Sequence, residues 1–330
     1  MKNLNRRRVL AALTAGAASL AAPAVAQRRG AWPERPIELI VGFAAGGGTD
    51  VTARTYARFL EQALGGSVIV VNRAGASGEI ALGGVARAKP DGYTLAVTNM
   101  PGLVTLPIER RNSQFQLDNF DYIANLVSDP SAFSVPGDSA ITSIASLVER
   151  ARAAPDALTY GSTGVGTDDH LALVTFQAAA GIRLVHVPFT GAGPLVTAIL
   201  GKHVDIAGLN VGEVAGAQRD LRMLVQGGAL RSRFAPSAPT FREAGFAMEM
   251  GSERGIVAPK GLPTEILEQL REATAQIARN PEFVDRVREQ FTEMDYLDGT
   301  PWRARLIEAD RNFRALWDRQ PWSETGARRG

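Results

Sequence analysis

The stretch Ile37–Asp50, IELIVGFAAGGGTD, joins a short apolar run to a glycine-rich loop and the start of a helix. The apolar run stops at Gly42, and three glycines follow at 46–48. Glycines let backbone N–H groups point into one concavity, and a helix N-terminus adds unpaired donors and partial positive charge. The stretch therefore predicts a strand, an anion-binding loop and a helix. The alternative is a tight turn without a ligand, since neither a Walker loop nor a G-x-G-x-x-G fingerprint is present.

Composition bounds the possible functions of the chain. At 330 residues it is long enough for two domains, and 45% hydrophobic and 21% charged residues are typical of a soluble globular protein. The net charge of +2 gives no strong field for nucleic acid, which is not expected as a partner. The absence of cysteine excludes disulfides and thiolate chemistry, and only three histidines argue against a His-rich metal site. No cofactor, metal or catalytic residue is predicted.

Residues 1–26 have the pattern of a cleaved signal peptide. A basic segment with Arg6–Arg8 precedes a weakly apolar run, and Ala24-Val25-Ala26 is a cleavage site before Gln27. The apolar run is too short and too rich in alanine for a membrane anchor. The arginines resemble a twin-arginine signal, with the Sec route as the alternative. The sequence thus predicts a free periplasmic protein cleaved near Ala26 and Gln27.

Short strands alternate with helices along both halves of the chain. In the first half we expect, after the opening strand, helix 51–64, strand 67–71, helix 79–88 and strand 93–98. In the second half we expect helix 144–153, strand 157–160, helix 168–180, strand 184–188, helix 192–200, and strands 204–210 and 222–225. This alternation predicts parallel α/β sheets, in which ligands bind outside the carboxyl ends of the strands. Extended passages at 119–135 and near 255–259 are expected to link the halves, and the remainder is expected to be helical.

A Gly/Ser/Thr loop before a helix occurs in each half, at 42–50 and at 161–168. Two lobes that each offer amide donors at a helix N-terminus form a clamp for an anionic ligand. Neither loop carries a Ser-His-Asp order or a G-x-S-x-G elbow, and no carboxylate pair has a neighbouring base. Donors are abundant and general acids and bases are scarce, which favours binding over catalysis.

From about Trp32 to Trp317 the chain resembles the periplasmic solute receptors of tripartite tricarboxylate transporters, the Bug or TctC family, and seven segments carry the resemblance. They are WPERPIELIVGFAAGGGTD (32–50), VVNRAGASG (70–78), AKPDGYTL (88–95), TYGSTGVGTDDHL (159–171), VHVPFTGAGP (185–194), PSAPTFREAG (236–245) and GIVAPKGLP (255–263). Together, at this spacing, they are specific for the family.

The resemblance implies an α/β, two-lobed type II periplasmic-binding-protein (Venus-flytrap) fold. Each lobe would be a mostly parallel sheet flanked by helices, and two crossover strands would join the lobes. Lobe 1 is expected at 32–128 plus 254–330, and lobe 2 at 129–253. The resemblance further implies a monomer that binds a small organic carboxylate and delivers it to the permease subunits of a membrane transporter. A sensor presenting its ligand to a membrane signalling protein, and an enzyme of the same shape, are the rival functions.

The family's binding residues carry over position by position. In the first lobe they are Phe43, Gly46, Gly47, Gly48, Thr49, Ser77, Thr98 and Asn99. In the second lobe they are Ser162, Thr163, Gly166, Thr167, His170, Phe189 and Asp205. Structural alternatives are open for some of them: capping or packing for His170, core packing for Phe189 and a structural hydrogen bond for Asp205. Asp50 is predicted to serve the helix N-terminus and not the ligand.

The chain departs from the family pattern at three places. Ala44-Ala45 replaces a Pro-containing pair, Thr190 stands where lysine is common, and Gly208-Leu209 replaces an aromatic and acidic pair. The last change removes a side of the pocket that often selects the far end of the ligand. The resemblance therefore does not identify the carboxylate.

Overall fold

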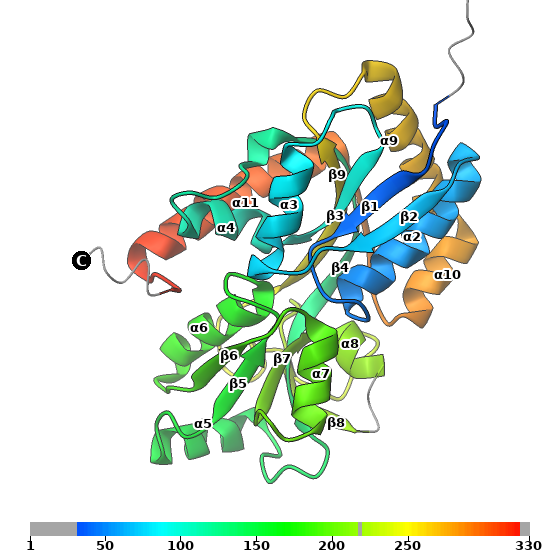
Figure 1. Ribbon diagram of the computed structural model, residues 1–330. Helices are drawn as coiled ribbons and strands as arrows, with labels where there is room; N and C mark the ends of the chain where they lie inside the picture. Colours follow the sequence, from blue (N-terminus) through cyan, green and yellow to red (C-terminus); the bar gives the residue numbers. More distant parts are fainter. Residues whose placement is uncertain (1–31, 217–219, 324–330) are drawn as a thin grey trace, which may run out of the picture.

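The computed structural model describes residues 32–216 and 220–323. They form two α/β lobes joined by long strands (Figure 1). In the first lobe, β1 (Ile37–Val41) lies between and parallel to β2 (Val68–Asn72) and β3 (Thr94–Met100). In the second lobe, β5 (Thr159–Ser162) lies between and parallel to β6 (Val185–Pro188) and β7 (Ile206–Asn210). The two-lobed fold with mostly parallel sheets is confirmed.

Two crossover strands, β4 (Phe120–Pro136) and β9 (Gly251–Pro259), run antiparallel to each other between the lobes. In the first lobe β9 pairs with β3, and in the second lobe β4 pairs with β7 and with β8 (Leu221–Gln226). Strand β4 is thus part of both sheets. The lobe boundaries given above remain a prediction.

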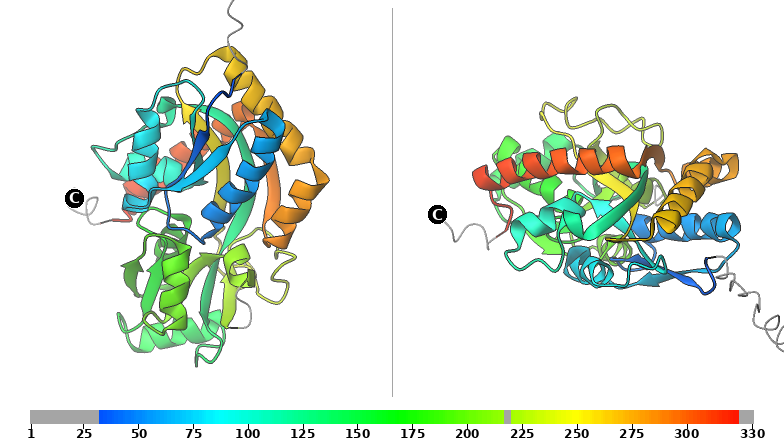
Figure 2. Two further views of the ribbon diagram at one scale, coloured as in Figure 1. Left: turned by 45° about the vertical axis from the view of Figure 1, so that its right-hand side comes forward. Right: turned by 90° about the horizontal axis from the view of Figure 1, so that it is seen from above.

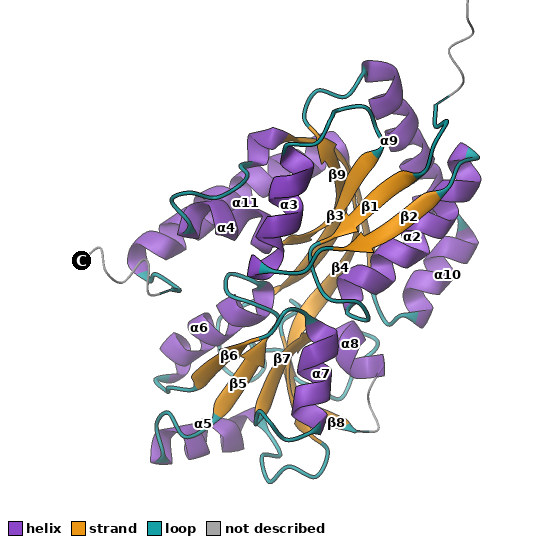
Figure 3. Ribbon diagram, in the orientation of Figure 1, coloured by secondary structure: helices purple, strands orange, loops and turns teal. Residues whose placement is uncertain are grey.

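Helices cover both faces of each sheet (Figures 2 and 3). In the first lobe, α2 (Gly48–Leu64), α9 (Thr264–Arg279) and α10 (Pro281–Glu289) pack on one face, and α3 (Glu79–Ala86), α4 (Gly102–Glu109) and α11 (Gly299–Arg319) on the other. In the second lobe, α5 (Ile144–Ala153) and α6 (Asp168–Ala180) oppose α7 (Ala192–Leu200) and α8 (Val211–Gly216). Each lobe therefore has an apolar core on either side of its sheet.

Helix α2, on which the predicted anion site depends, has glycines at both ends. Gly47 precedes it with extended backbone at φ −86°, and Gly65 ends it in the left-handed conformation, donating its N–H to the carbonyl of Glu61. This is a common helix ending, and glycine adopts it without a steric penalty. The helix therefore presents its first amides at the carboxyl edge of β1.

The expectation that the C-terminal remainder is all helical is wrong. Residues Glu293–Asp298 form β10, which pairs antiparallel with β4. The helices α4 and α8 were also not expected. They are short, with 8 and 6 residues, so they hold too few turns for a helical period to stand out. Among residues 32–216 and 220–323, no helix has the length and apolar character needed to cross a membrane.

Candidate functional site

The two lobes are closed on each other at their loops. The N–H of Ala44 in the first lobe donates to the carbonyl of Thr190 in the second at 3.1 Å. The hydroxyl of Thr105 donates to the carbonyl of Gly166 at 2.6 Å. The glycine loops that the sequence singled out thus meet at the interface between the lobes, as a clamp requires.

A small cavity lies between the lobes at the N-terminus of α2. Its volume is about 20 Å³, and it is lined by Phe43, Gly47, Gly48, Thr49, Asn99, Thr163, Ala192, Asn210 and Glu213. Six of these residues were predicted from the sequence to bind the ligand. Pockets for small organic ligands usually measure about 300–1,000 Å³. In this closed form the cavity is too small for an organic acid.

A carboxylate of the chain itself lies at the predicted anion site. The N–H of Gly48, the first residue of α2, donates to Oε1 of Glu213 at 2.8 Å. The N–H of Asn210 donates to Oε2 of the same side chain at 3.0 Å. Glu213 lies on α8, in the second lobe, so this contact bridges the lobes. Sequence reasoning missed Glu213, because nothing local to α8 places it opposite α2.

Gly46 and Asp50 complete the loop before α2. Gly46 takes φ +87°, so it is the glycine whose backbone conformation requires its residue type. Its N–H donates to Oδ2 of Asp50 at 3.0 Å, and Nδ2 of Asn72 donates to Oδ1 at 2.9 Å. Burial raises the pKa of Asp50, but hydrogen bonds from Arg54, Gly46 and Asn72 outweigh it and bring the pKa below its usual value. Asp50 therefore stabilises the loop from the first turn of α2, and the N-cap of the helix is Gly47.

A buried arginine lies beside the same helix N-terminus. Arg254, on β9, is 1% exposed. Its Nη2 donates to Oδ2 of Asp129 at 3.2 Å and to Oδ1 of Asn210 at 3.0 Å. A Cβ on Gly48 would stand 2.5 Å from Nη2, so the guanidinium packs directly on the first residue of α2. The two glycine loops, 42–50 and 161–168, contain no lysine or arginine, and this cation comes from β9 instead.

Acidic side chains surround this arginine. Burial raises the pKa of Asp129 to about 7, with Arg254 opposing the rise and Glu213 adding to it. Burial also raises the pKa of Asp168 to about 6, and burial together with Asp168 and Glu213 raises that of Asp169. One guanidinium thus stands among several carboxyl groups, and the local balance of charge is acidic. Within the described ranges, no three His, Asp or Glu side chains are arranged to hold a metal ion.

The hydroxyls predicted in the second lobe mostly serve their own loop. Oγ of Ser162 lies 2.6 Å from Nε2 of His186, and Oγ1 of Thr163 donates to Asp169 at 2.5 Å. Oγ1 of Thr167 donates to the carbonyl of Gly164 at 2.8 Å. These bonds fix the loop against α6. Their use for a ligand stays a prediction, and it would require the hydroxyls to exchange partners.

His170 has the contacts of a capping and packing residue, which is the structural alternative given for it above. It is 5% exposed, and its ring stacks on that of His186 with centroids 4.2 Å apart. Its Nδ1 accepts the N–H of Gly166 at 3.1 Å. Burial, with a contribution from His186, lowers the pKa of His170 to about 3, and burial lowers that of His186 to about 4. Both rings are therefore neutral at neutral pH and brace the loop.

We expect His170→Asn to lose less stability than the unsubstituted protein when the pH falls from 7.5 to 5. The folded protein keeps His170 neutral, whereas the unfolded chain takes up a proton below its pKa of 6.5. The stability linked to this ring is present above pH 6.5 and is lost as the pH falls, by about 2 kcal/mol at pH 5. Asn keeps an acceptor for the N–H of Gly166. Chemical denaturation at both pH values, with exposed His203→Asn as the control, measures the difference; equal pH dependence in the two variants would contradict it.

The remaining predicted residues lie in three different places. Thr98 and Asn99 lie at the end of β3: Thr98 donates to the carbonyl of Gly255 at 3.2 Å, and Nδ2 of Asn99 donates to Oγ of Ser252 at 2.6 Å. Ser77 and Phe189 line a separate cavity of about 270 Å³ between the lobes. Asp205 is exposed and accepts hydrogen bonds from N and Oγ1 of Thr159 at 2.8 and 2.7 Å. These are the contacts of a structural residue, and Asp205 lies apart from the cavities described here.

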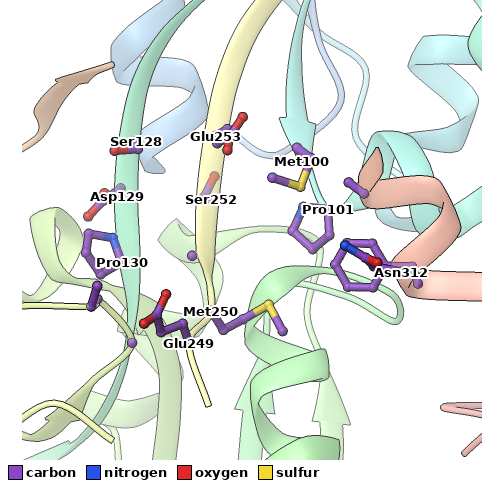
Figure 4. Close-up of a pocket in the computed structure, with 16 residues that line it drawn as sticks. Met100, Pro101, Ser128, Asp129, Pro130, Glu249, Met250, Ser252, Glu253 and Asn312 are labelled. Carbon is purple, nitrogen blue, oxygen red and sulfur yellow. The ribbon is translucent and has the colours of Figure 1, made fainter. Parts of the chain in front are cut away.

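Two larger cavities border the crossover strands. One, of about 350 Å³, shares Gly48, Ala192 and Glu213 with the small cavity and extends to α7 and residues 289–292. The other, of about 460 Å³, is lined by Ser128–Pro130 on β4, Ser252 and Glu253 on β9, and part of α11 (Figure 4). The charged side chains that line either cavity are all carboxylates, so charge does not distinguish the two. The first cavity is the better continuation of the site because it shares lining residues with the small cavity at the N-terminus of α2.

Comparison with known proteins agrees with this geometry. Residues 52–311 match the family model described as tripartite tricarboxylate transporter family receptor. The chain belongs to this receptor family. A UPF0065 protein of Cupriavidus necator is 33% identical over 308 residues, covering 93% of this chain and 94% of the relative. The protein BugT of Bordetella pertussis is 31% identical, covering 80% and 82%.

Solved structures of this receptor family have the same fold. The periplasmic binding protein BugD has a TM-score of 0.83 and 28% identity, covering 87% of this chain and 98% of that one. An R. palustris protein solved with adipate has a TM-score of 0.82 and 28% identity, covering 90% and 98%. Family and neighbours are binding proteins, so this receptor is not an enzyme.

Proposed function

We propose that this receptor captures a small organic carboxylate between its lobes at the N-terminus of α2. The observation that carries the proposal is the Glu213 carboxylate, held there by the N–H of Gly48 at 2.8 Å. A site that accepts a carboxylate from its own chain has the donors that a carboxylate ligand needs. The adipate bound to the R. palustris relative supports the same ligand class.

The proposed receptor delivers its ligand to the permease subunits of a membrane transporter and acts as a periplasmic monomer. Family membership supports this role. The predicted signal peptide, residues 1–26, lies outside the described residues, and its role in export rests on the sequence alone. The intact mass of the exported protein tests it: a mature chain that still begins at Met1 would exclude cleavage near Gln27.

A thermal-shift screen tests the ligand class. A ligand that binds only the folded form stabilises it by about 2.7 kcal/mol at 100 times Kd, which raises the melting temperature by several degrees. We expect such a rise with at least one member of a panel of mono-, di- and tricarboxylates, and none with the uncharged amides of the same acids. Titration calorimetry followed by product analysis should return the ligand unchanged. A panel with no shift at millimolar concentration would contradict the proposal.

A further inference from the structure

Arg254 has hydrogen-bonding capacity that the closed form does not use. Its Nη2 has two partners, whereas Nε and Nη1 are buried and have none among the described residues. An arginine that is 1% exposed gains nothing from water, so unpartnered donors on it are costly. Nη1 lies against Gly48, 2.9 Å from where a Cβ would stand. The unused donors therefore adjoin the N-terminus of α2.

Glu213 occupies the anion site but leaves the unused N–H donors of Arg254 without a partner. Its two oxygens accept from Gly48 and Asn210, and no hydrogen bond joins it to Arg254 within the described part of the chain. Its carboxylate also adds to the acidic surroundings of Asp129 and Asp168. The side chain is only half-buried and borders the cavity of about 350 Å³. It can therefore move outward into that cavity without crossing the core.

We propose that Glu213 is a built-in substitute for the ligand, and that Arg254 binds the carboxylate that displaces it. This inference rests on the proposed function and names the residues that carry it out. With Glu213 withdrawn, the small cavity and its larger neighbour, which share Gly48 and Ala192, become one space. The combined volume reaches the range of small-ligand pockets, which begins at about 300 Å³. The entering carboxylate accepts from Gly48 and from the free donors of Arg254.

The two residues thus have opposite effects on affinity. Glu213 competes with the ligand for the same amide and ties the lobes together without it, so its charge weakens ligand binding. Arg254 has donors that only the ligand satisfies, so its charge strengthens binding. Arg254 belongs to a crossover strand, so it remains next to the site whether the lobes are open or closed.

Glu213→Gln tests the first half of the inference. Glutamine has nearly the same shape but carries an NH2 donor in place of one carboxylate oxygen, so it cannot keep both bonds to Gly48 and Asn210 in their present geometry. We expect the Kd for adipate, measured by calorimetry, to fall by about 3- to 10-fold because a charge-assisted bond no longer competes. Without ligand, small-angle scattering should give a larger radius of gyration than for the unsubstituted protein. Exposed Glu149→Gln is the matched control and should change neither quantity.

The double variant Arg254→Met/Asp129→Asn tests the second half. Removing both partners avoids leaving a lone buried charge, which would destabilise the fold. We expect circular dichroism to stay native and the Kd for adipate to rise by about 100-fold or more. Arg73→Met is the control, since Arg73 is an exposed arginine paired with Glu38.

These measurements distinguish a wrong role for Glu213 or Arg254 from a wrong ligand class. Weaker adipate binding by Glu213→Gln would mean that the Glu213 carboxylate stabilises the ligand-bound form, and would overturn its role as a substitute. An unchanged ligand-free radius would overturn its role in tying the lobes. Unchanged affinity in a folded double variant would overturn the role of Arg254. If the unsubstituted protein binds neither adipate nor any other acid of the panel, the proposed ligand class is at fault, and the ligand-free scattering still decides the role of Glu213.

Discussion

Gly48→Val is expected to abolish adipate binding. A Cβ at this position would stand 2.5 Å from Nη2 and 2.7 Å from Cζ of Arg254, so the guanidinium would have to leave its place. Arg254 is held by Asp129 and Asn210, and breaking a buried ion pair costs about 3–5 kcal/mol. The added methyl groups would also cover the amide that the carboxylate needs. Calorimetry should detect no binding at millimolar adipate, while circular dichroism keeps its native shape.

The matched control lies at the other end of the same helix. Gly65→Asn places its Cβ where nothing lies within 4 Å, and asparagine tolerates the left-handed φ of +68° found at this helix end. Its adipate affinity should stay within a few-fold of the unsubstituted value. Substitution of Gly47 is a weaker test of the site than substitution of Gly48. Its φ of −86° is open to any residue, and its Cβ would meet only Ala192, at 3.2 Å. Normal binding by Gly48→Val would remove the N-terminus of α2 from the site.

Trp302→Ala should give the largest loss of stability. This side chain is fully buried on α11, and its ring meets that of Tyr122 on β4 at 5.3 Å in an edge-to-face arrangement. It also packs over Gly255 on β9, where a Cβ would stand 2.4 Å from the indole. Replacing a buried tryptophan by alanine costs about 3–5 kcal/mol. Urea denaturation should show this loss as a lower midpoint with an unchanged slope.

Trp302→Phe is the informative comparison. The indole N–H is buried without a partner among the described residues, so phenylalanine removes an unsatisfied donor while keeping an aromatic ring. Its loss of stability should be less than half that of Trp302→Ala. Equal losses would mean that the full shape of the indole, and not merely a buried aromatic ring, is what stabilises the contact. Below the melting transition both variants should bind adipate with normal affinity, because Trp302 does not line the site.

Local patterns were enough to predict most of the fold. Helices 144–153, 168–180 and 192–200 begin and end as the sequence indicated, because caps and glycines mark their ends. The long strand β4 was expected only as an extended passage. Strand β10 was missed because its residues are partly exposed, so its sequence lacks the alternation of a half-buried strand. Its place follows from pairing with β4, which is distant in the chain.

The candidate site could be predicted only where backbone chemistry decides it. Gly47, Gly48 and Thr49 line the small cavity, and they were proposed as binding residues because a glycine loop before a helix offers amides regardless of the rest of the chain. Arg254 and Glu213 were not found, because each acquires its role from partners 125 and 165 positions away in the sequence. The same limit applies to Asp205, whose partner Thr159 on a neighbouring strand makes it structural.

The pairing of β4 with β9 has a mechanical consequence. Val127 lies opposite Arg254 where these two strands pass from one lobe to the other, so Arg254 and Asp129 are close to the line about which the lobes would turn. Two atoms near a rotation axis hardly change their separation when the lobes turn. Gly48 and Glu213 lie on opposite lobes, so the distance between them grows as soon as the lobes open. The buried Arg254–Asp129 pair therefore offers little resistance to opening. The force needed to part the lobes is set by a few contacts at their edges, so the rate of ligand release can be tuned there while the charged centre stays intact.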